Sequence, residues 1–565
     1  MKLPILALSF LLLLVAAYRL YGRWVARQLA ITDEHKTPAH TVNDGVDFVP
    51  TRPFYLFAQH FSAIAAAGPI AGPILACQNW GWVPCLLWIS LGVVLIGAVH
   101  DFSTLTASVR HGARSIADIT REHLGPRAGI AMMAFIWIAL VYVIVAFADI
   151  TAASFTTVIE ELEGVHLGFN PGGAVASASV MYLLLAVIMG FVQRYLRLPL
   201  WLVTLIFVPA TLAVAWLGTH ISNLMVLEAR TWGILILAYC AIASMVPVWS
   251  LLQPRGYLGG FVLYLVLALG IIGVFFGGYE IKATAFRSWD IGGITGSLFP
   301  FLFVTIACGA CSGFHGLVCS GTTSKQVDRE SHMQGVGYGG MLAEGFVALI
   351  ALVTIMIVTP AEVVGLKPGT IYGNGIGQFL SLIIGKENLL FAITFGAMAF
   401  STFVFDTLDV CTRLGRYIMQ ELFKWRTRAG AAIATAVTIV LPVYFIAFSQ
   451  EGSWVKFWTL FGASNQLLAA LTLLAITIWL YRARKRVWFT LFPLIFVLTI
   501  TLWSLGGLTL ANMRSVQGFG VEMLNALAAG ALITLALYLA VTALVQVRGE
   551  RKTRLAARVL ADGGS

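Results

Sequence analysis

An apolar stretch of the chain reads His60-Phe-Ser-Ala-Ile-Ala-Ala-Ala-Gly68-Pro69-Ile-Ala-Gly72-Pro73. Its two Gly-Pro pairs remove backbone donors and disfavour helical dihedral angles. A second interrupted stretch reads Thr305-Ile-Ala-Cys308-Gly309-Ala-Cys311-Ser312-Gly313-Phe-His315-Gly316, and Ser320 and Thr322 follow it. Backbone groups freed at such breaks inside a bilayer need partners from protein, water or a ligand. The two stretches therefore predict broken transmembrane helices near residues 60–76 and 305–320.

The composition around these stretches is that of a membrane protein. Of the 565 residues, 59% are hydrophobic and 11% are charged, whereas a soluble domain carries about 25% charged residues. So few charges cannot cover the surface of a soluble protein of this length. A soluble enzyme, a nucleic-acid-binding protein and a disordered protein are all excluded, and we expect contact with a lipid bilayer and no nucleic acid.

Apolar runs long enough to cross a bilayer predict an all-α polytopic protein with about 15 transmembrane helices. The runs lie at about 3–21, 54–76, 82–108, 128–156, 174–192, 199–218, 231–252, 258–279, 295–320, 336–359, 388–411, 430–449, 454–480, 487–507 and 525–547. The shorter run Gly375–Gly385 is expected to be re-entrant or interfacial. The first run is followed by Arg19, Arg23 and Arg27 and by no small-residue cleavage site, which favours an uncleaved anchor over a signal peptide.

These runs suggest three parts of the chain. Residues 1–53 form an N-terminal anchor helix and a cytoplasmic loop, 54–480 a transporter core, and 481–565 C-terminal helices with a basic tail. Of the 36 Lys and Arg residues, alternation through fifteen spans leaves eight outside, namely Lys2, Arg230, Lys282, Arg287, Lys367, Lys386, Lys456 and Arg514. The other 28 fall in inner segments, which by the positive-inside rule predicts an outer N-terminus and a cytoplasmic C-terminus.

The expected topology gives the two broken spans opposite directions across the membrane. A pair of opposed broken helices indicates an inverted-repeat transporter with a site near the bilayer midplane. Each stretch taken alone also has a purely structural explanation, because small residues are common in membrane helices where helices pack closely or kink. The sequence contains neither a Walker A motif nor room for a nucleotide-binding domain, so a gradient or a partner must supply the driving force.

Ionisable residues inside the spans are the next candidates, because each is costly in hydrocarbon. They are His60, His100, Asp101, Asp149, His315, Glu344, Asp406 and Asp409. Glu344 has no basic residue within ten positions, so as a lone buried carboxylate it suits a proton carrier. Asp101 and Asp409 lie near Arg110 and Arg413, so a structural ion pair is as plausible for them as proton coupling. His60 and His315 belong to the broken stretches and suit carboxylate binding or proton transfer.

The Cys308-x-x-Cys311-x-x-x-His315-x-x-x-Cys319 spacing resembles that of a zinc site. Structural zinc sites usually occupy turns of small soluble modules, whereas this string lies in an apolar span, where small residues at helix contacts explain the cysteines. We therefore expect no metal and no cofactor. Asn465 and Gln466, two amides in a long apolar run, are interpreted as partners in interhelical hydrogen bonds.

Several motifs resemble those of the carbon starvation protein A family. They include Asn43-Asp44-Gly45, Phe48-Val49-Pro50-Thr51, Ala98-Val-His-Asp101-Phe102, Ser312-Gly-Phe-His315, Ser320-Gly-Thr-Thr323 and Gly337-Tyr-Gly-Gly-Met-Leu342, besides the two broken stretches. The resemblance runs from about residue 18 to 480. It implies a multi-pass inner-membrane permease of bacteria, similar to amino acid–polyamine–organocation transporters with a five-plus-five inverted-repeat core. Family motif positions carry over to Gly68, Pro69, Gly72, Pro73, Asp101, His315, Ser320, Thr322, Glu344 and Asp409.

The resemblance also implies proton-coupled uptake of peptides or pyruvate. Longer family members have a further N-terminal span and more sequence where this chain has only Pro360 to Glu387, and that departure bears on substrate choice.

The expected function is a secondary importer, not an enzyme, of a small carboxylate such as pyruvate, or of small peptides, with protons as coupling ion and sodium as the alternative. The expected substrate-binding residues are His60, Gly68, Pro69, Gly72, Pro73, Gly309, Ser312, His315, Ser320 and Thr322. Helix ends at Gly68–Gly72 and Gly309–Gly316 would offer backbone N–H groups to a carboxylate. Glu344, Asp101 and Asp409 are expected to couple protons. A membrane sensor without transport is the alternative function.

Overall fold

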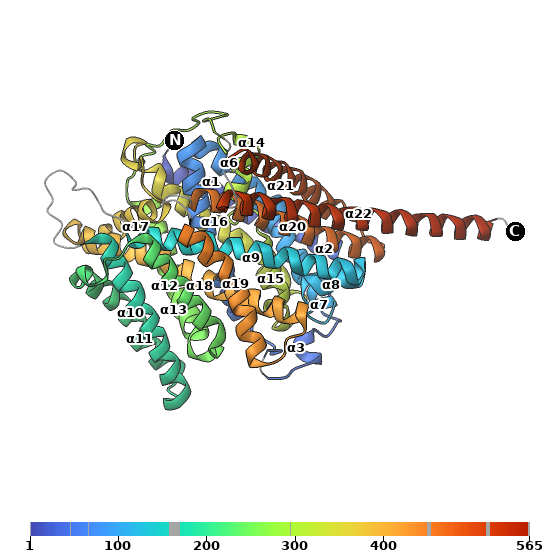
Figure 1. The fold of residues 1–565 in the computed structure, drawn as a ribbon, viewed down its shortest axis with the longest axis horizontal. Helices are drawn as coiled ribbons and strands as arrows, with labels where there is room; N and C mark the ends of the chain where they lie inside the picture. Colours follow the sequence, from blue (N-terminus) through green and yellow to red (C-terminus); the bar gives the residue numbers. More distant parts are fainter. Residues whose placement is uncertain are drawn as a thin grey trace.

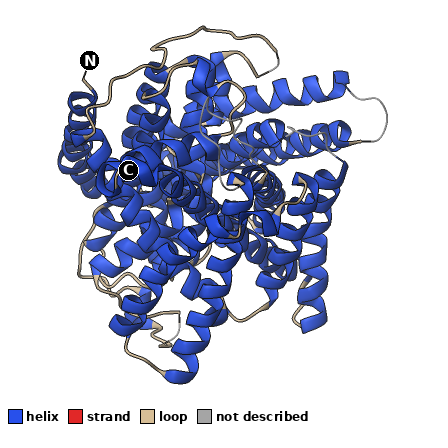
Figure 2. Cartoon of the chain, turned by 90° about the vertical axis from the view of Figure 1, so that its left-hand side faces the viewer, coloured by secondary structure: helices blue, strands red, loops and turns tan. Residues whose placement is uncertain are grey.

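In a computed structural model the chain is built from helices, and the sequence-based fold class, an all-α membrane protein, is confirmed. The structure describes residues 2–45, 47–65, 67–156, 170–293, 295–448, 454–515 and 520–562. Within these ranges there is no β-strand, and Figure 2 shows helices joined by loops. The α-helices are α1 (Leu3–Ala16), α2 (Arg23–Leu29), α3 (Pro38–Thr41), α4 (Pro53–Ile64), α5 (Gly68–Trp80), α6 (Trp82–Gly92), α7 (Ala98–Arg110), α8 (Ile116–Leu124), α9 (Pro126–Phe155), α10 (Pro171–Phe191), α11 (Leu200–His220), α12 (Ala229–Met245), α13 (Leu252–Phe276), α14 (Leu298–Thr305), α15 (Gly313–Gly321), α16 (Gly339–Met356), α17 (Pro368–Ile384), α18 (Leu389–Phe423), α19 (Arg428–Phe448), α20 (Trp454–Arg482), α21 (Trp488–Ser515) and α22 (Val521–Asp562).

The expected number of about 15 spans is not confirmed. Among the described residues, 12 helices are long and apolar enough to cross a membrane, or 13 if the bent pair of α4 and α5 is one span. The two other expected spans are shorter in the structure. The run 231–252 becomes α12, which has 17 residues, and the run 295–320 is divided between α14 and α15.

Both predicted helix breaks are present. α4 ends at Ile64 and α5 begins at Gly68, with a bend of 45° between them. α14 ends at Thr305 and α15 begins at Gly313. The four halves pack crosswise, since α4 contacts α15 and α5 contacts α14. This reciprocal pairing is the arrangement expected of two broken helices related by an inverted repeat.

Small residues let the broken helices approach closely. A Cβ atom on Gly72 would lie 2.6 Å from the carbonyl oxygen of Thr305, and one on Gly68 would overlap the side chain of Cys308. A larger side chain at either position would push α5 away from the second broken helix. Gly68-Pro69 therefore lies at the break, where α5 begins, whereas Gly72-Pro73 lies inside α5, and both glycines let the second broken helix approach.

The carbonyl groups left without helical partners at the end of α14 are satisfied by three side chains from other helices. Trp458 Nε1 donates to Thr305 O at 3.2 Å, Trp88 Nε1 donates to Ile306 O at 3.1 Å, and Gln466 Nε2 donates to Phe303 O at 2.8 Å. Buried backbone groups in a membrane need such partners. The interhelical role expected of Gln466 is confirmed by this bond.

The stretch Gly375–Gly385 is part of a longer helix than the sequence analysis expected. α17 begins at Pro368, where Lys367 provides an extended N-cap, and its interior is mostly buried. It packs along α18, α13 and α16. Its 17 residues correspond to about 26 Å at 1.5 Å per residue, which is less than the hydrocarbon thickness of about 30 Å.

The C-terminal helices lie beside the core. Figure 1 shows α20, α21 and α22 running together, with the far end of α22 projecting past the rest of the molecule. α20 is the most buried candidate span, with 94% of its apolar window inside the protein, whereas the window of α22 is 28% buried. α20 is therefore a part of the core, and it contacts both halves of the second broken helix, α14 and α15.

Candidate functional site

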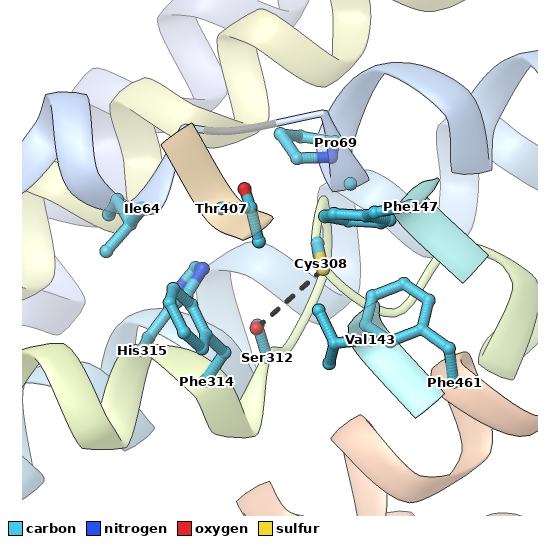
Figure 3. A pocket seen from close by; sticks show the side chains of 11 residues that line it. Ile64, Pro69, Val143, Phe147, Cys308, Ser312, Phe314, His315, Thr407 and Phe461 are labelled. Atoms are coloured by element: carbon cyan, nitrogen blue, oxygen red, sulfur yellow. Dashed lines mark hydrogen bonds between the residues drawn. The ribbon is translucent and has the colours of Figure 1, made fainter. Parts of the chain in front are cut away.

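A small cavity lies between the two broken helices. Its polar lining comes from Cys308, Ser312, His315 and Thr407, as Figure 3 shows. The remaining lining residues are Ile64, Gly68, Pro69, Val143, Phe147, Phe314 and Phe461. The volume open to the centre of a water molecule is about 10 Å³, which corresponds to about one water. A substrate of several heavy atoms therefore requires the broken helices to move apart.

His315 connects this cavity to two buried carboxylates. Its Nδ1 atom lies 2.9 Å from Asp101 Oδ2 on α7, and its Nε2 atom lies 3.1 Å from Glu344 Oε2 on α16. The side chains of both carboxylates are 0% exposed and that of His315 is 1% exposed. The contact with Asp101 is a hydrogen bond, whereas Nε2 and Glu344 approach each other at ion-pair distance without hydrogen-bond geometry. The structure thus joins three predicted residues into one cluster.

Two further histidines border this cluster. His100 Nδ1 lies 2.7 Å from Asp101 Oδ1, so Asp101 is shared between two imidazole rings. His60 Nδ1 lies 2.9 Å from Thr323 Oγ1, and His60 does not line the cavity. Among the described residues, the Nε2 atoms of His60 and His100 have no hydrogen-bond partner although both are buried.

The N-terminus of α15 is already capped by a side chain. Asn465 Oδ1 accepts a 2.9 Å hydrogen bond from Phe314 N, while its amide Nδ2 donates to Ser312 Oγ at 3.1 Å and contacts Cys308 Sγ at 3.3 Å. The interhelical hydrogen bonding expected of Asn465 is confirmed. A substrate carboxylate would have to displace this amide to reach the backbone of α15, so Ser312 Oγ and His315 are the groups more readily offered to it.

Other predicted substrate residues have local structural contacts in this structure. Gly72 packs against Thr305, and Pro73 is buried inside α5. Gly309 lies against Ala348 and Pro69. Ser320 Oγ donates to Gly316 O and accepts from Ile116 N, and Thr322 Oγ1 donates to Val318 O. Gly68, Pro69, Ser312 and His315 are the four predicted substrate residues that border the cavity.

The geometry can be compared with known proteins. A family model of the carbon starvation protein CstA matches residues 2–374 and 363–504. The peptide transporter CstA of Campylobacter jejuni is 32% identical over 569 residues, which cover 86% of this chain and 77% of that protein. The chain belongs to the carbon starvation protein CstA family. The resemblance seen in the sequence motifs is thereby confirmed.

A second relative of this CstA family member is named for a different substrate. The pyruvate/proton symporter BtsT of Escherichia coli is 30% identical over 606 residues, covering 89% of this chain and 81% of that protein. Among solved structures, a manganese transporter mutant of Eremococcus coleocola matches with a TM-score of 0.44 and 13% identity, over 87% of this chain and 95% of that one. A likeness at this level supports no argument about cargo.

The structure corrects the expected partners of three carboxylates in this CstA family member. Glu344 is not a lone carboxylate, because His315 lies beside it. Asp101 pairs with His100 and His315, whereas Arg110 pairs with Glu330 at 2.7 Å. Asp409 pairs with Arg255, a residue that the sequence analysis left in a loop.

Arg255 is the centre of a second buried ionic cluster. Its guanidinium contacts Asp406 Oδ1 at 2.7 Å and also pairs with Asp409, and it donates to Phe405 O at 2.8 Å. Tyr239 Oη donates to Asp409 Oδ2 at 2.7 Å. None of these residues lines the cavity. The signal in the sequence was the close pair Asp406 and Asp409, two carboxylates in one span that need a cation nearby.

Proposed function

We propose that this protein is a secondary active importer of a small carboxylate such as pyruvate, coupled to protons. The observation that carries the proposal is the position of His315, which borders the cavity between the broken helices and contacts both Asp101 and Glu344. The names of two relatives, a peptide transporter and a pyruvate/proton symporter, support the same class of function.

Coupling follows from the charges of the cluster. With His315 protonated and both carboxylates ionised, Asp101, His315 and Glu344 carry one net negative charge, which repels an anionic substrate. Uptake of one proton by Glu344 makes the cluster neutral and leaves the imidazolium with one carboxylate partner. The cavity side of His315 can then attract a substrate carboxylate. Proton and anion thus bind together, and each favours the other by linkage.

The lining of the cavity favours a small monocarboxylate over a peptide. Its polar lining consists of Ser312, His315, Cys308 and Thr407, whereas Ile64, Val143, Phe147, Phe314 and Phe461 make the rest apolar. A pyruvate anion needs polar groups around its carboxylate and apolar side chains around its methyl group. A zwitterionic peptide would also need a carboxylate for its ammonium group, and the nearest ones, Asp101 and Glu344, lie behind His315. Small peptides remain the second choice of substrate.

The remaining assignments follow from the family and the charge distribution. We place the protein in the bacterial inner membrane, with the N-terminus outside and the C-terminus in the cytoplasm, because the fifteen-span alternation of the sequence analysis puts 28 of the 36 basic residues inside. Residues 54–480 would form the transporter core. Gly68, Pro69, Ser312 and His315 would bind substrate, and Glu344 and Asp101 would couple protons.

Uptake into proteoliposomes tests the proposal. Purified protein in vesicles with an acidic exterior should accumulate labelled pyruvate, and accumulation should stop when a protonophore collapses the pH gradient. Unlabelled dipeptides should compete weakly or not at all. Uptake that is unchanged without a pH gradient would contradict proton coupling, and binding without any transport would favour the sensor alternative.

A further inference from the structure

Three metal-ligating side chains meet at the ends of α7 and α8, away from the cavity. His111 follows the last residue of α7, and Glu122 and His123 lie in the last turn of α8. One ligand atom from each of the three lies within 4.8 Å of the others. Glu122 lies eleven positions after His111 along the chain, so this cluster is formed by folding and has no recognisable spacing in the sequence.

The two imidazole rings present their Nε2 atoms to one another. The Nε2 atoms of His111 and His123 are 2.9 Å apart, and His111 Nε2 lies 3.9 Å from Glu122 Oε1. Bonds from a transition metal to imidazole nitrogen are about 2.0–2.1 Å. Two such bonds at an angle near 90° place the nitrogen atoms about 2.9 Å apart, as these rings are. Glu122 lies at the surface and reaches a shared ion by a small rotation of its side chain.

His111 is held in the tautomer that a metal requires. Its Nδ1 atom lies 2.6 Å from Ala107 O. Because a carbonyl oxygen only accepts hydrogen bonds, Nδ1 carries the proton and the Nε2 lone pair points toward His123. A backbone carbonyl on the second ring nitrogen is a common support for a metal-bound histidine.

We propose that His111, His123 and Glu122 bind a divalent first-row transition ion of the Co²⁺, Ni²⁺ or Zn²⁺ class. Two imidazoles and one carboxylate are suitable ligands for these ions, and water completes the coordination. The alternative is a hydrogen bond from His123 to His111 without a metal. In that arrangement Arg482 Nη1 donates to His123 Nδ1, and the two atoms are 3.5 Å apart.

Arg482 can leave His123 without losing its other partners. It pairs with Glu550 at 2.7 Å and donates to Gln546 Oε1 at 3.3 Å, both on α22. The nearby cation Arg114 is likewise paired, with Glu122 Oε2 at 3.0 Å. Arg482 is therefore balanced by Glu550, whereas Arg114 would share Glu122 with the ion, because Arg114 holds Oε2 and Oε1 is the oxygen nearer to His111. An ion at this position would join α7, which carries Asp101, to α8.

Metal binding to the purified full-length protein tests the proposal. The protein is prepared in detergent with its affinity tag removed, and Zn²⁺ binding is measured by isothermal titration calorimetry, with Co²⁺ absorption reporting the ligands. We expect one site per chain. Because even outer partners of a metal site change affinity by about 10–100-fold, H111Q and H123Q should each weaken binding at least tenfold. E122Q should weaken it less.

The matched control is H220Q, since His220 is a histidine at the end of α11 that contacts Trp216. Its Zn²⁺ affinity should equal that of the unchanged protein. Unaltered binding in both H111Q and H123Q, or no binding up to roughly 1 mM ion, which corresponds to about 4 kcal/mol, would overturn the proposal. Either result would show the pair of rings to be a hydrogen bond only. Neither result depends on the transport function, because no substrate enters the measurement.

Discussion

Replacement of Glu344 by Gln tests the coupling mechanism most directly. The change removes a negative charge 3.1 Å from His315 Nε2 while preserving the size of the side chain. At an effective dielectric constant of about 20, a pair of unit charges at this separation interacts by about 5 kcal/mol. The variant resembles the protonated form of the wild type permanently. We expect it to bind substrate without needing a proton and to be unable to release one.

Two transport assays, accumulation and exchange of labelled pyruvate, measure the loss of proton coupling in this variant. A gradient of about one pH unit supplies about 1.4 kcal/mol per proton, so one-to-one coupling allows the unchanged protein up to about tenfold accumulation of pyruvate. E344Q should show no accumulation above equilibrium, yet it should still exchange labelled for unlabelled pyruvate across the membrane. E362Q is the control, because Glu362 is exposed and bonds only locally to Thr359.

The two assays separate the possible failures. Accumulation by E344Q at the wild-type level would refute the role of Glu344 in coupling. Loss of exchange in a variant that remains folded would show that Glu344 binds substrate or holds His315, and that its proton is not the coupled one.

Three other expectations follow from the contacts. R255M should lower the free energy of unfolding by about 3–5 kcal/mol, because it removes the ion-pair partner of the buried Asp409 and of the partly buried Asp406. The combination with D406N and D409N should recover part of that loss in a denaturation assay. G72A should destabilise the protein by about 1–3 kcal/mol through overlap with Thr305 O, whereas G530A, where a Cβ meets open space, should not. Among the seven cysteines only Cys308 is partly exposed, and it lines the cavity. A thiol reagent should therefore label Cys308 first, and pyruvate should slow the labelling. The variant C308S should lose this labelling.

The broken helices could be predicted because their cause is local. Gly68-Pro69 and the Gly-Ser-rich stretch after Cys308 disfavour a continuous helix through their own backbone chemistry, and family motifs added the same positions. The helices end and begin again close to the predicted stretches, since α4 ends at Ile64 and α5 begins at Gly68, while α14 ends at Thr305 and α15 begins at Gly313. The reciprocal packing of α4 on α15 and α5 on α14 also follows from the expected opposite directions of the two spans.

The site was less predictable because its partners are distant in sequence. Asp101 and His315 are 214 positions apart, and no periodic pattern reports which face of α7 meets α15. Ser320 and Thr322 follow the motif of His315, yet both hydroxyls donate to carbonyls one turn earlier, and Ser320 Oγ also accepts from Ile116 N. The caps Trp88 and Trp458 were missed because a tryptophan in an apolar span is ordinary, and its N–H shows a role only once the freed carbonyl is located.

Two buried ionic clusters compete for the coupling role, and their chemistry separates them. Arg255 stays charged at any pH that a cell experiences, so Asp406 and Asp409 keep a permanent counter-ion, and protonating either of them would discard an ion pair without presenting a charge to the cavity. The cluster of Asp101, His315 and Glu344 differs, because His315 borders the cavity and Glu344 lies beside it. A proton that arrives at Glu344 therefore changes what a substrate meets, whereas one that arrives at Asp409 does not. This difference favours Glu344 and Asp101 over Asp409 as the coupling carboxylates, and it makes the Arg255 cluster a support for the packing of α13 against α18.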